Sequence, residues 1–347
     1  MKKFNVGIVG YGWAATAHIP AINAGPLGQV TAVCSSRPLD AAELSARYDG
    51  SIKTCTDLGA LLADPAIHVV SITGYPWLHA EQVIAAAKAG KHIIVEKPLA
   101  LSLAEVRAIE QAVRAAGVKF CICFECLFSS QFQAVLSVLQ RGLLGKLHYA
   151  EVDYYHGIGP WYDEFRWCTK NSGGGSSLLE AGCHAMDALL HCIPDEVESV
   201  FSCATASSHP TFKAYEYPTT SSTLVRFKSG AVGKCASVID CFQPYYFHTH
   251  LVGREGSLLD DRFHSNLLKG LDKTQWSKLA MRLVDSGDVA DHPYQTQFDT
   301  FFAALDRGED MALTGLAEAV RTHEVIFAAD RSARENRPVK LEEIRAQ

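Results

Sequence analysis

The first 125 residues alternate between short apolar runs and longer alanine-rich segments that carry polar positions. The apolar runs are rich in β-branched residues, which is typical of parallel strands covered on both faces. Strands are expected at FNVGIVG, QVTAVCS, IHVVSIT, KHIIVEK and VKFCICF, and helices at 40–48, 57–63, 79–89 and 103–116. Repeated strand–helix alternation predicts an α/β domain with a doubly wound parallel sheet, the Rossmann arrangement.

Beyond residue 125 the pattern changes, because strand-like segments follow one another without helices between them. Helices are expected at 130–141, 178–192, 294–307 and 314–334, and strands at KLHYAEVDYYHG, VESVFSCATA, TSSTLVRFKSG, AVGKCASVID and FHTHLVGREGSLL. Strands in succession predict a mainly antiparallel sheet, and with the flanking helices an α+β domain. We therefore predict two domains, covering residues 1–125 and 126–347.

Charge and hydropathy narrow the classes of function. The 347 residues are 48% hydrophobic and 20% charged, as in soluble globular proteins. A net charge of -6 without a local run of Lys or Arg argues against general nucleic-acid binding. No uninterrupted apolar run reaches the roughly 18 residues that a membrane span needs. Gly7, Gly10 and Gly12 break the N-terminal apolar run, so it predicts a strand and turn rather than a secretory signal.

The 11 cysteines are odd in number and scattered, which favours reduced thiols over a disulfide framework. We therefore expect a cytoplasmic protein. Cys121, Cys123 and Cys126 form one tight cluster within the apolar run VKFCICFEC. Their setting predicts buried strand thiols rather than ligands, and we expect no metal site in this protein.

The turn after the first strand, GYGWAA, has the Gly-x-Gly-x-x-Ala spacing of dinucleotide-binding turns. In such a turn Gly10 permits the bend, Gly12 lets the backbone approach a pyrophosphate, and Ala15 allows close packing of helix and strand. The helix N-terminus, at Trp13 and Ala14, faces the negative charge of the ligand. We expect these five residues to bind a nicotinamide dinucleotide.

The end of the second strand, Cys34-Ser35-Ser36-Arg37, should contact the adenosine ribose. A site that prefers NAD usually places Asp or Glu there to bind the 2′-hydroxyl group. Hydroxyl groups and an arginine suit a 2′-phosphate instead, so Ser35, Ser36 and Arg37 favour NADP over NAD. The alternative is that Arg37 is only a solvated loop residue, and both cofactors stay open.

Lys97 directly follows the strand HIIVEK within Glu96-Lys97-Pro98. In an open α/β sheet this carboxyl edge is where ligands bind. A lysine there can polarise or hydrogen-bond a substrate oxygen, and Pro98 fixes the backbone that directs it; the alternative is an ordinary surface lysine. Further cofactor contacts are expected from Glu96 and Lys97 themselves and from Thr73, Gly74 and His79 on the neighbouring strand end and helix.

The segment GGGSSLLEAGCHAMDALLHC, residues 173–192, places ionisable residues at helical spacing. Glu180, His184, Asp187 and His191 fall at i, i+4, i+7 and i+11, on one stripe of a helix. His184 titrates near neutrality, as a general acid or base must, and Glu180 one turn earlier can orient it. The alternative for Glu180 is a capping box with Ser177, which would give it only a role in helix initiation. His191 is expected to be structural.

Aromatic and basic residues precede the glycine loop in YYHGIGPWYDEFRWCTK. Flat rings can stack on a sugar face, and Arg or Lys can bond its hydroxyl groups. Aromatic core filling is the alternative for each ring. The expected substrate contacts are Trp161, Arg166, Trp167 and Lys170, with Glu180 and His184; Tyr162 is a further candidate, and Tyr154, His156, Tyr245, Tyr246 and His248 are weaker ones.

The Gly10/Gly12/Ala15 turn, Glu96-Lys97-Pro98 and the segment 173–187 together resemble the glucose–fructose oxidoreductase / inositol dehydrogenase (Gfo/Idh/MocA) family. That family typically shows a GxGxxA turn, E-K-P after a strand, and GGG followed by D-x-G-x-H-x-x-D. The resemblance spans essentially the whole chain. Glu180 stands where the family more often has Asp. Other departures are Tyr75-Pro76 in place of a Thr-Pro/Asn loop, and Glu125 and Leu127 where Asn and Arg are frequent.

The resemblance implies a Rossmann domain followed by an α+β domain that binds substrate and forms oligomer contacts through its sheet. It implies NAD or NADP, a cyclic polyol or sugar as the substrate, and a homodimer or homotetramer. Lys97 matches the catalytic lysine and His184 the proton-transfer histidine of the family. Hydride then passes between the nicotinamide and a secondary alcohol or ketone, while Lys97 stabilises the charge on the substrate oxygen.

Two other functions fit the same motifs. Some relatives in the family cleave glycosides through oxidation, elimination and re-reduction with tightly bound NAD, and Lys97 and His184 would serve there too. A sensor that only binds a dinucleotide has no need of both residues. The sequence favours the dehydrogenase over these two.

Overall fold

The structure is a computed structural model that describes residues 3–284 and 292–346. The chain divides into two compact units, one of Met1–Glu125 with Asp288–Val320 and one of Cys126–Gly287 with Arg321–Gln347. The predicted assignment of all of 126–347 to one domain is therefore wrong for the segment that carries helix α9 (Tyr294–Asp306). This helix packs beside α1 (Trp13–Ala24), and the ring of its Phe302 stacks on Phe4 at 6.1 Å. The burial of these rings explains why the chain returns to the first unit.

The first unit contains a parallel six-stranded sheet in the order β3-β2-β1-β4-β5-β6, the doubly wound order predicted for a Rossmann domain. Strand β3 was not predicted, because its three residues are too few to show a pattern. The strands are β1 (Phe4–Val9), β2 (Gly28–Cys34), β3 (Lys53–Cys55), β4 (Val69–Ile72), β5 (His92–Val95) and β6 (Phe120–Ile122).

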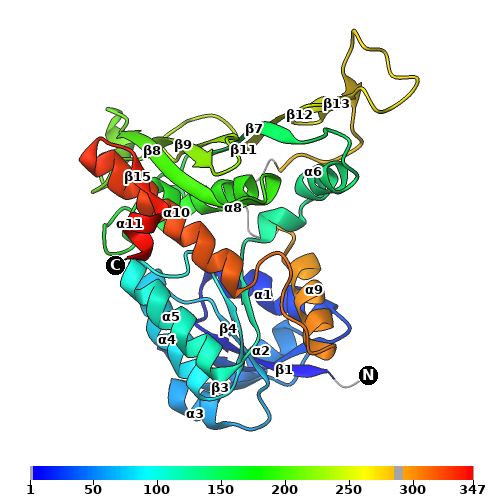
Figure 1. Cartoon of the computed structure of the whole chain (residues 1–347). Helices are drawn as coiled ribbons and strands as arrows, with labels where there is room; N and C mark the ends of the chain where they lie inside the picture. The colour runs from blue at the N-terminus through cyan, green and yellow to red at the C-terminus, as the bar shows by residue number, and fades with distance from the viewer. Residues whose placement is uncertain (1–2, 285–291, 347) are drawn as a thin grey trace. The chain divides into compact units, whose positions relative to one another are not determined.

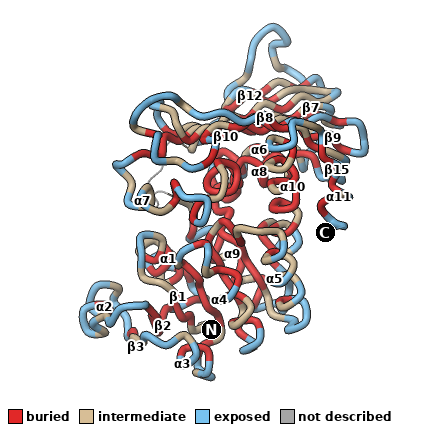
Figure 2. Tube along the Cα trace, turned by 90° about the vertical axis from the view of Figure 1, so that its left-hand side faces the viewer, coloured by how far each residue is buried: buried red, intermediate tan, exposed pale blue. Residues whose placement is uncertain are grey.

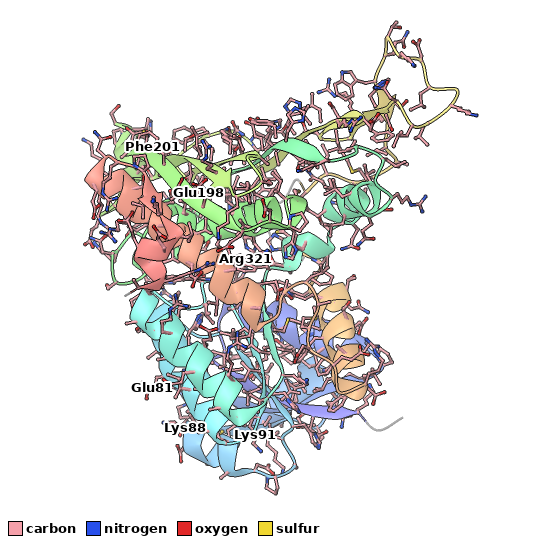
Figure 3. All side chains as sticks on the ribbon, viewed as in Figure 1. Glu81, Lys88, Lys91, Glu198, Phe201 and Arg321 are labelled. Atoms are coloured by element: carbon pink, nitrogen blue, oxygen red, sulfur yellow. The ribbon has the colours of Figure 1, made fainter. Side chains whose placement is uncertain are left out.

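Helices cover both faces of this sheet (Figure 1). Helices α4 and α5 are neighbours on one face, and α1 and α9 are neighbours on the other. Ser102 caps α5 by accepting a hydrogen bond from the backbone N–H of Glu105, as its sequence predicts. Lys91, labelled in Figure 3, is buried and donates to the backbone oxygens of Asp64 and Ile67. The remaining helices are α2 (Ala41–Arg47), α3 (Leu58–Ala63), α4 (Pro76–Lys88) and α5 (Leu103–Ala116).

The second unit contains a nine-stranded sheet in the order β14-β13-β12-β11-β7-β10-β9-β8-β15. The β7–β10 pair is parallel and the other pairs are antiparallel, so the sheet is mixed but mainly antiparallel, as predicted. The strands are β7 (Leu147–Tyr155), β8 (Val197–Thr205), β9 (Thr220–Phe227), β10 (Val232–Val238), β11 (Tyr246–Gly253), β12 (Gly256–Leu259), β13 (Arg262–Ser265), β14 (Ser277–Lys278) and β15 (Val339–Lys340).

Helix α8 (Cys183–Cys192) packs on strands β7 and β10 of this sheet. Strand side chains alternate accordingly: Ala150 and Val152 are buried, whereas Tyr149 and Glu151 remain half-exposed on the opposite face. The other helical segments are η1 (Glu125–Phe128), α6 (Ser130–Gln140), α7 (Phe165–Cys168), η2 (Leu178–Gly182), η3 (Pro210–Phe212), α10 (Leu316–Glu335), which crosses from one unit to the other, and α11 (Leu341–Arg345).

The predicted helix over 178–192 is two segments rather than one. Residues Leu178–Gly182 form a π-helical turn, and the α-helix begins at Cys183. The predicted strand FHTHLVGREGSLL is also two strands, β11 and β12, joined by a tight turn. At a bulge in β8, the extra residue Glu198 reaches Arg226 on β9 at 3.1 Å (Figure 3).

Burial follows the strands in each unit (Figure 2). The β1, β4 and β5 strands are almost entirely buried, whereas α2 exposes most of its residues. Cys121, Cys123 and Cys126 are all buried, as predicted, and burial raises the pKa of Cys121 to about 12. Among residues 3–284 and 292–346, no helix combines the length and the apolar character that crossing a bilayer demands.

Candidate active site

The turn after β1 is tied to the end of β4. Gly10 has φ +95°, and a Cβ at this position would lie 2.8 Å from the backbone nitrogen of Gly74. Thr73 donates its backbone N–H to Val9 at 2.8 Å and its hydroxyl to the backbone oxygen of Gly10 at 2.9 Å. Thr73 and Gly74 therefore shape the turn from behind, and only glycine fits at position 10.

Gly12 is different, because a Cβ there would meet no atom within 4 Å. It is the N-cap of α1, and no side chain caps this helix. Ala15 is fully buried against the sheet, whereas Trp13 is 46% exposed and Ala14 is half-buried. Open space before an uncapped helix N-terminus suits a pyrophosphate, so these residues fit a dinucleotide.

The residues after β2 divide into one buried and two exposed positions. Ser35 is buried, and its backbone N–H bonds the oxygen of Cys55 at 3.0 Å. Its hydroxyl accepts the backbone N–H of Arg37 at 3.4 Å, so this side chain shapes the loop. Ser36 and Arg37 have exposed side chains. Their exposure is what contact with a ribose or a 2′-phosphate requires.

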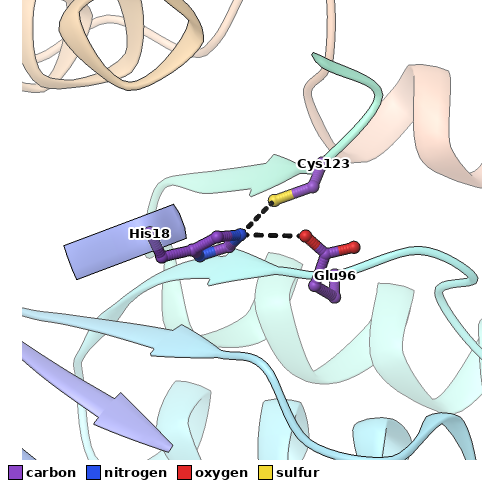
Figure 4. A group of neighbouring side chains, drawn as sticks. All are labelled: His18, Glu96 and Cys123. Atoms are coloured by element: carbon purple, nitrogen blue, oxygen red, sulfur yellow. Dashed lines mark hydrogen bonds and ion pairs between the residues drawn. The ribbon is translucent and has the colours of Figure 1, made fainter. Parts of the chain in front are cut away.

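Glu96, at the end of β5, is the centre of a buried hydrogen-bond network (Figure 4). Its Oε1 lies 2.8 Å from Nε2 of His18 and accepts the hydroxyl of Tyr294 at 2.8 Å. Nδ1 of His18 lies 2.8 Å from the hydroxyl of Ser71, and its Nε2 also lies 3.8 Å from Sγ of Cys123. Burial raises the pKa of Glu96, but the hydrogen bond and charge of His18 outweigh this, so its pKa is below the usual value.

The network fixes the backbone of Lys97. The second carboxylate oxygen of Glu96 accepts the backbone N–H of Lys97 at 3.1 Å. On the other side, Nδ1 of His79 lies 2.7 Å from the backbone oxygen of Pro98, and its Nε2 lies 3.2 Å from that of Gly74. The shorter contact identifies Nδ1 as the donor in the neutral ring. Burial lowers the pKa of His79, which favours that neutral form.

His79 was predicted to contact the cofactor, but its ring is fully buried and both ring nitrogens face backbone oxygens. Its contacts instead hold the Lys97–Pro98 segment against the end of β4. Glu96 is likewise 6% exposed and occupied by His18, Tyr294 and the Lys97 N–H. Both side chains act on the shape of the site rather than at its surface.

In the second unit, Glu180 and His184 lie on either side of the junction between the π-helical turn and α8. Glu180 is 2% exposed and His184 is 4% exposed. The alternative for Glu180, a capping box, is absent, since Ser177 makes no capping bond and its hydroxyl lies 3.2 Å from that of Ser221. Single π-helical turns recur at functional sites, where they change the direction of side chains relative to an α-helix. The burial of a carboxylate without a capping role favours a chemical role for Glu180.

A chain of hydrogen bonds runs beside His184. The ring of Tyr154 stacks against His184 with centroids 6.4 Å apart. The Tyr154 hydroxyl lies 2.9 Å from Nδ1 of His156, and Nε2 of His156 lies 2.9 Å from the hydroxyl of Tyr162. Burial raises the pKa of Tyr154 well above its usual value, so this hydroxyl stays protonated. Tyr154 contacts His184, and the hydrogen bonds extend from Tyr154 to His156 and Tyr162.

The remainder of the predicted stripe is structural. Asp187 is fully buried and accepts the hydroxyl of Thr322 on α10 at 2.7 Å. His191 lies 3.7 Å from the same carboxylate. These contacts join α8 to α10 within the second unit, as expected for His191.

The predicted substrate contacts before the glycine loop differ in their exposure and in their bonding partners. Trp161 is 56% exposed and bonds the backbone oxygen of Gly157 at 3.1 Å. Arg166 is exposed and Trp167 is half-buried. Lys170 forms a surface ion pair with Glu216 at 3.1 Å. The exposed indole of Trp161 can still stack on a sugar face. Lys170, in contrast, already has a carboxylate partner.

Two family models match the chain. The oxidoreductase family with an NAD-binding Rossmann fold matches residues 4–124, and the GFO/IDH/MocA C-terminal domain matches residues 132–259. The chain belongs to the Gfo/Idh/MocA family of oxidoreductases. As a member of this family it is an NAD(P)-dependent oxidoreductase.

Curated members of the Gfo/Idh/MocA family match over most of the chain. Myo-inositol 2-dehydrogenase of Thermotoga maritima is 25% identical over 98% of this chain and 99% of its own. Levoglucosan dehydrogenase of Pseudarthrobacter phenanthrenivorans is 27% identical over 85% of this chain and 82% of its own. The scyllo-inositol 2-dehydrogenase (NAD(+)) of Bacillus subtilis is 27% identical over 90% of each.

Solved structures share the fold of this Gfo/Idh/MocA oxidoreductase. Levoglucosan dehydrogenase in complex with NADH and levoglucosan has a TM-score of 0.82 at 23% identity, covering 98% of this chain and 100% of the other. An oxidoreductase from Desulfitobacterium hafniense described as putatively NADPH-dependent has a TM-score of 0.84 at 21% identity, covering 99% of each. At this identity the likeness concerns the fold.

Three residues of the hydrogen-bond network around Glu96 were missed by sequence reasoning: His18, Ser71 and Tyr294. His18 lies one turn after Ala15, on the same buried face of α1, so helical spacing could have indicated it. Ser71 lies within a buried apolar strand. Tyr294 is separated from Glu96 by 198 positions, and no local pattern reports that contact.

Three of the departures from the family pattern also have defined surroundings. Glu125, where Asn is frequent, is 1% exposed and lies 2.8 Å from Nδ1 of His292. Leu127, where Arg is frequent, is also 1% exposed. Tyr75 stacks on Trp77 at 4.4 Å, with both rings 41% exposed.

Proposed function

We propose that this protein transfers hydride between a nicotinamide cofactor and a secondary alcohol or ketone of a sugar, glycoside or cyclitol. The observation that carries the proposal is that the backbone around Lys97 is fixed by hydrogen bonds. Its backbone is held from both sides, by Glu96 at its own N–H and by His79 at the next residue. Two side chains that fix the backbone around one lysine at the carboxyl end of β5 are expected where that lysine is a reacting group.

We assign three roles. Lys97 donates a hydrogen bond to the substrate oxygen and stabilises its developing negative charge. His184 accepts the hydroxyl proton in the oxidation direction and returns it in reduction. Glu180 orients His184 and supports the charge that His184 gains. The cofactor, when bound, supplies or accepts the hydride.

Gly10, Gly12, Trp13, Ala14 and Ala15 are our proposed contacts to the cofactor pyrophosphate, since the open space at Gly12 and the uncapped helix start fit it. Arg37 and Ser36, both exposed, support NADP over NAD at the ribose. Replacing Arg37 with Ala should raise the KM for NADP at least tenfold and leave the KM for NAD within about twofold. Equal effects on both cofactors would instead mean that Arg37 does not contact the 2′-phosphate.

The substrate class rests on the similarity to enzymes named for inositols and levoglucosan. This substrate class is also supported by the hydrogen-bonded row of Tyr154, His156 and Tyr162, which begins beside His184. Hydroxyl and imidazole groups in such a row suit a ligand rich in hydroxyl groups. Trp161, Arg166 and Trp167 remain candidate contacts. Lys170 is a weaker candidate because of its ion pair with Glu216.

The test is a substrate panel with three variants. Cyclitols, anhydrosugars, aldoses and glycosides are offered with NAD or NADP, and reduction of the cofactor is followed at its nicotinamide absorbance. Lys97→Met and His184→Ala should each lower kcat by about 100-fold or more, while cofactor binding measured by fluorescence changes less than about threefold. Lys88→Met, at the exposed end of α4, is the matched lysine control and should retain kcat. Unchanged kcat in His184→Ala would overturn the proton-transfer role.

The names of the relatives favour net redox chemistry over glycoside cleavage. A glycosidase would release the aglycone without added cofactor, and the same panel distinguishes the two outcomes. We also propose that the protein is cytoplasmic and assembles as a homodimer or homotetramer through its large sheet. Light scattering of the purified chain measures that assembly.

A further inference from the structure

Strands β7 and β11 place three metal-ligand side chains on one face of the nine-stranded sheet. His248 and His250 are two positions apart on β11, so both project from the same face. Glu151 on β7 pairs directly with His250 in the antiparallel register. This is the face opposite α8, because the intervening residues Thr249 and Val152 are buried.

We propose that Glu151, His248 and His250 bind a divalent transition-metal ion, Zn²⁺ for this set of nitrogen and oxygen ligands. One ligand atom from each of the three side chains lies within 4.8 Å of the other two. Nε2 of His248 is 4.0 Å from Oε2 of Glu151. Two His and one Glu are a ligand set that zinc accepts, with water in the fourth position. Bonds of about 2.0–2.2 Å require only small movements of these half-exposed side chains.

The surroundings already orient the ligands. Nδ1 of His248 faces Oδ1 of Asp260 at 3.2 Å, so Nε2 is the nitrogen that points to Glu151. Asp260 is itself fixed by the Tyr246 hydroxyl at 2.6 Å and the Thr249 N–H at 2.9 Å. A carboxylate behind a ligating imidazole is the usual outer partner at zinc sites. The arrangement therefore has support beyond the three ligands.

The charge balance at the cluster also suits a cation. Glu151, Asp153 and Asp260 are three carboxylates, and Lys234 is the ammonium group bonded to the first two. Lys234 holds Oε1 of Glu151 at 2.8 Å, which leaves Oε2 directed toward His248. The Tyr149 hydroxyl donates to Oε2 at 2.8 Å and keeps the carboxylate in place. A bound ion would lie beside net negative charge.

The experiment is titration of the full, untagged and chelator-treated chain with Zn²⁺ by calorimetry and with Co²⁺ by visible absorption. We expect one site per chain with a Kd in the micromolar range or tighter, and cobalt bands of four- or five-coordinate geometry. His250→Ala and Glu151→Gln should weaken binding at least tenfold. His148→Ala, an exposed histidine on β7 outside the cluster, should bind as the parent does.

Two results would overturn the proposal. One is binding by the parent chain no tighter than by His250→Ala with that variant folded, as judged by circular dichroism. The other is loss of binding only on replacement of Cys203, the exposed thiol, with Ser. Lys234→Met supplies a gain-of-affinity test, because removing the ammonium group should tighten Zn²⁺ binding severalfold; unchanged or weaker binding by the folded variant counts against the site. None of these readouts depends on hydride transfer.

Discussion

The imidazole of His18 and the carboxylate of Glu96 lie 2.8 Å apart, and the residues are 0% and 6% exposed. Glu96 uses its other oxygen to hold the backbone N–H of Lys97. A residue in the first helix thus determines the position of a lysine that follows the fifth strand. In this protein the dinucleotide turn and the lysine are linked, because α1 carries both the end of the turn, Trp13–Ala15, and His18.

Replacing His18 with Ala should destabilise the first unit. Breaking this buried pair leaves the Glu96 carboxylate with the Tyr294 hydroxyl and the Lys97 N–H but without its imidazole partner, and the expected loss in free energy of unfolding is about 3 kcal/mol. Urea unfolding followed by circular dichroism measures it. His148→Ala, an exposed histidine in the second unit, is the control and should change stability by less than about 0.5 kcal/mol. A loss below about 1 kcal/mol for His18→Ala would show that the pair is not what holds Glu96.

The two glycines of the turn should respond differently to alanine. Gly12→Ala meets no atom within 4 Å, so folding should be unchanged while the methyl group occupies the approach to a pyrophosphate. We expect a Tm within about 2 °C of the parent and a cofactor Kd at least tenfold weaker. Gly10→Ala places a Cβ against Gly74 at φ +95° and should lower the Tm as well. Equal cofactor affinity in Gly12→Ala and the parent would remove the turn from the cofactor site.

Glu180 can be tested against the residue more frequent in the family at its position. Glu180→Asp keeps the charge and shortens the side chain, whereas Glu180→Gln keeps the length and removes the charge. If the carboxylate supports a charged His184, Gln should reduce kcat more than tenfold and Asp considerably less. Steady-state kinetics over a pH range separates the two. Identical losses in both variants would indicate that Glu180 serves packing alone.

Asp330 on α10 gives the second unit a pH-dependent stability. Burial raises the pKa of this carboxyl from 3.8 to about 6, against a hydrogen bond from Ser176 and the charge of Arg334. The folded chain then binds this proton more tightly than the unfolded chain does. The resulting contribution to the free energy of unfolding is fully present below about pH 4 and is lost as the pH rises through about 6. Asp330→Asn cannot ionise and should be more stable than the parent by on the order of 1–2 kcal/mol near pH 8.

The measurement for Asp330→Asn is urea unfolding at about pH 4 and pH 8. The difference from the parent should be present at the higher pH and vanish at the lower one. An equal difference at both values would mean that the carboxyl is not protonated in the folded chain. Asp306→Asn, at the exposed end of α9, is the matched control.

The sequence was sufficient for the parallel Rossmann sheet and for the mainly antiparallel sheet, because strand period and helix spacing are local properties. Lys97 and His184 were proposed in the same way, from short motifs, and their roles stay predictions. Helix α9 was placed in the wrong unit, because the amphipathic pattern of a 13-residue helix does not indicate which of two sheets the helix covers. The π-helical turn at Leu178–Gly182 was missed because its residues have an ordinary helical pattern. His79 was predicted at the cofactor, but its role depends on backbone oxygens brought near it by tertiary folding.

The return of Asp288–Val320 to the first unit has a consequence for synthesis on the ribosome. The nucleotide-binding half cannot be completed by the residues translated first, since the phenol that bonds Glu96 belongs to Tyr294. Until that residue emerges, a nascent chain lacks the helix that packs beside α1 on one face of the sheet, and Phe4 lacks its stacking partner. Maturation of the two halves is therefore coupled in time, and ribosome-stalled chains that end before α9 should remain sensitive to protease.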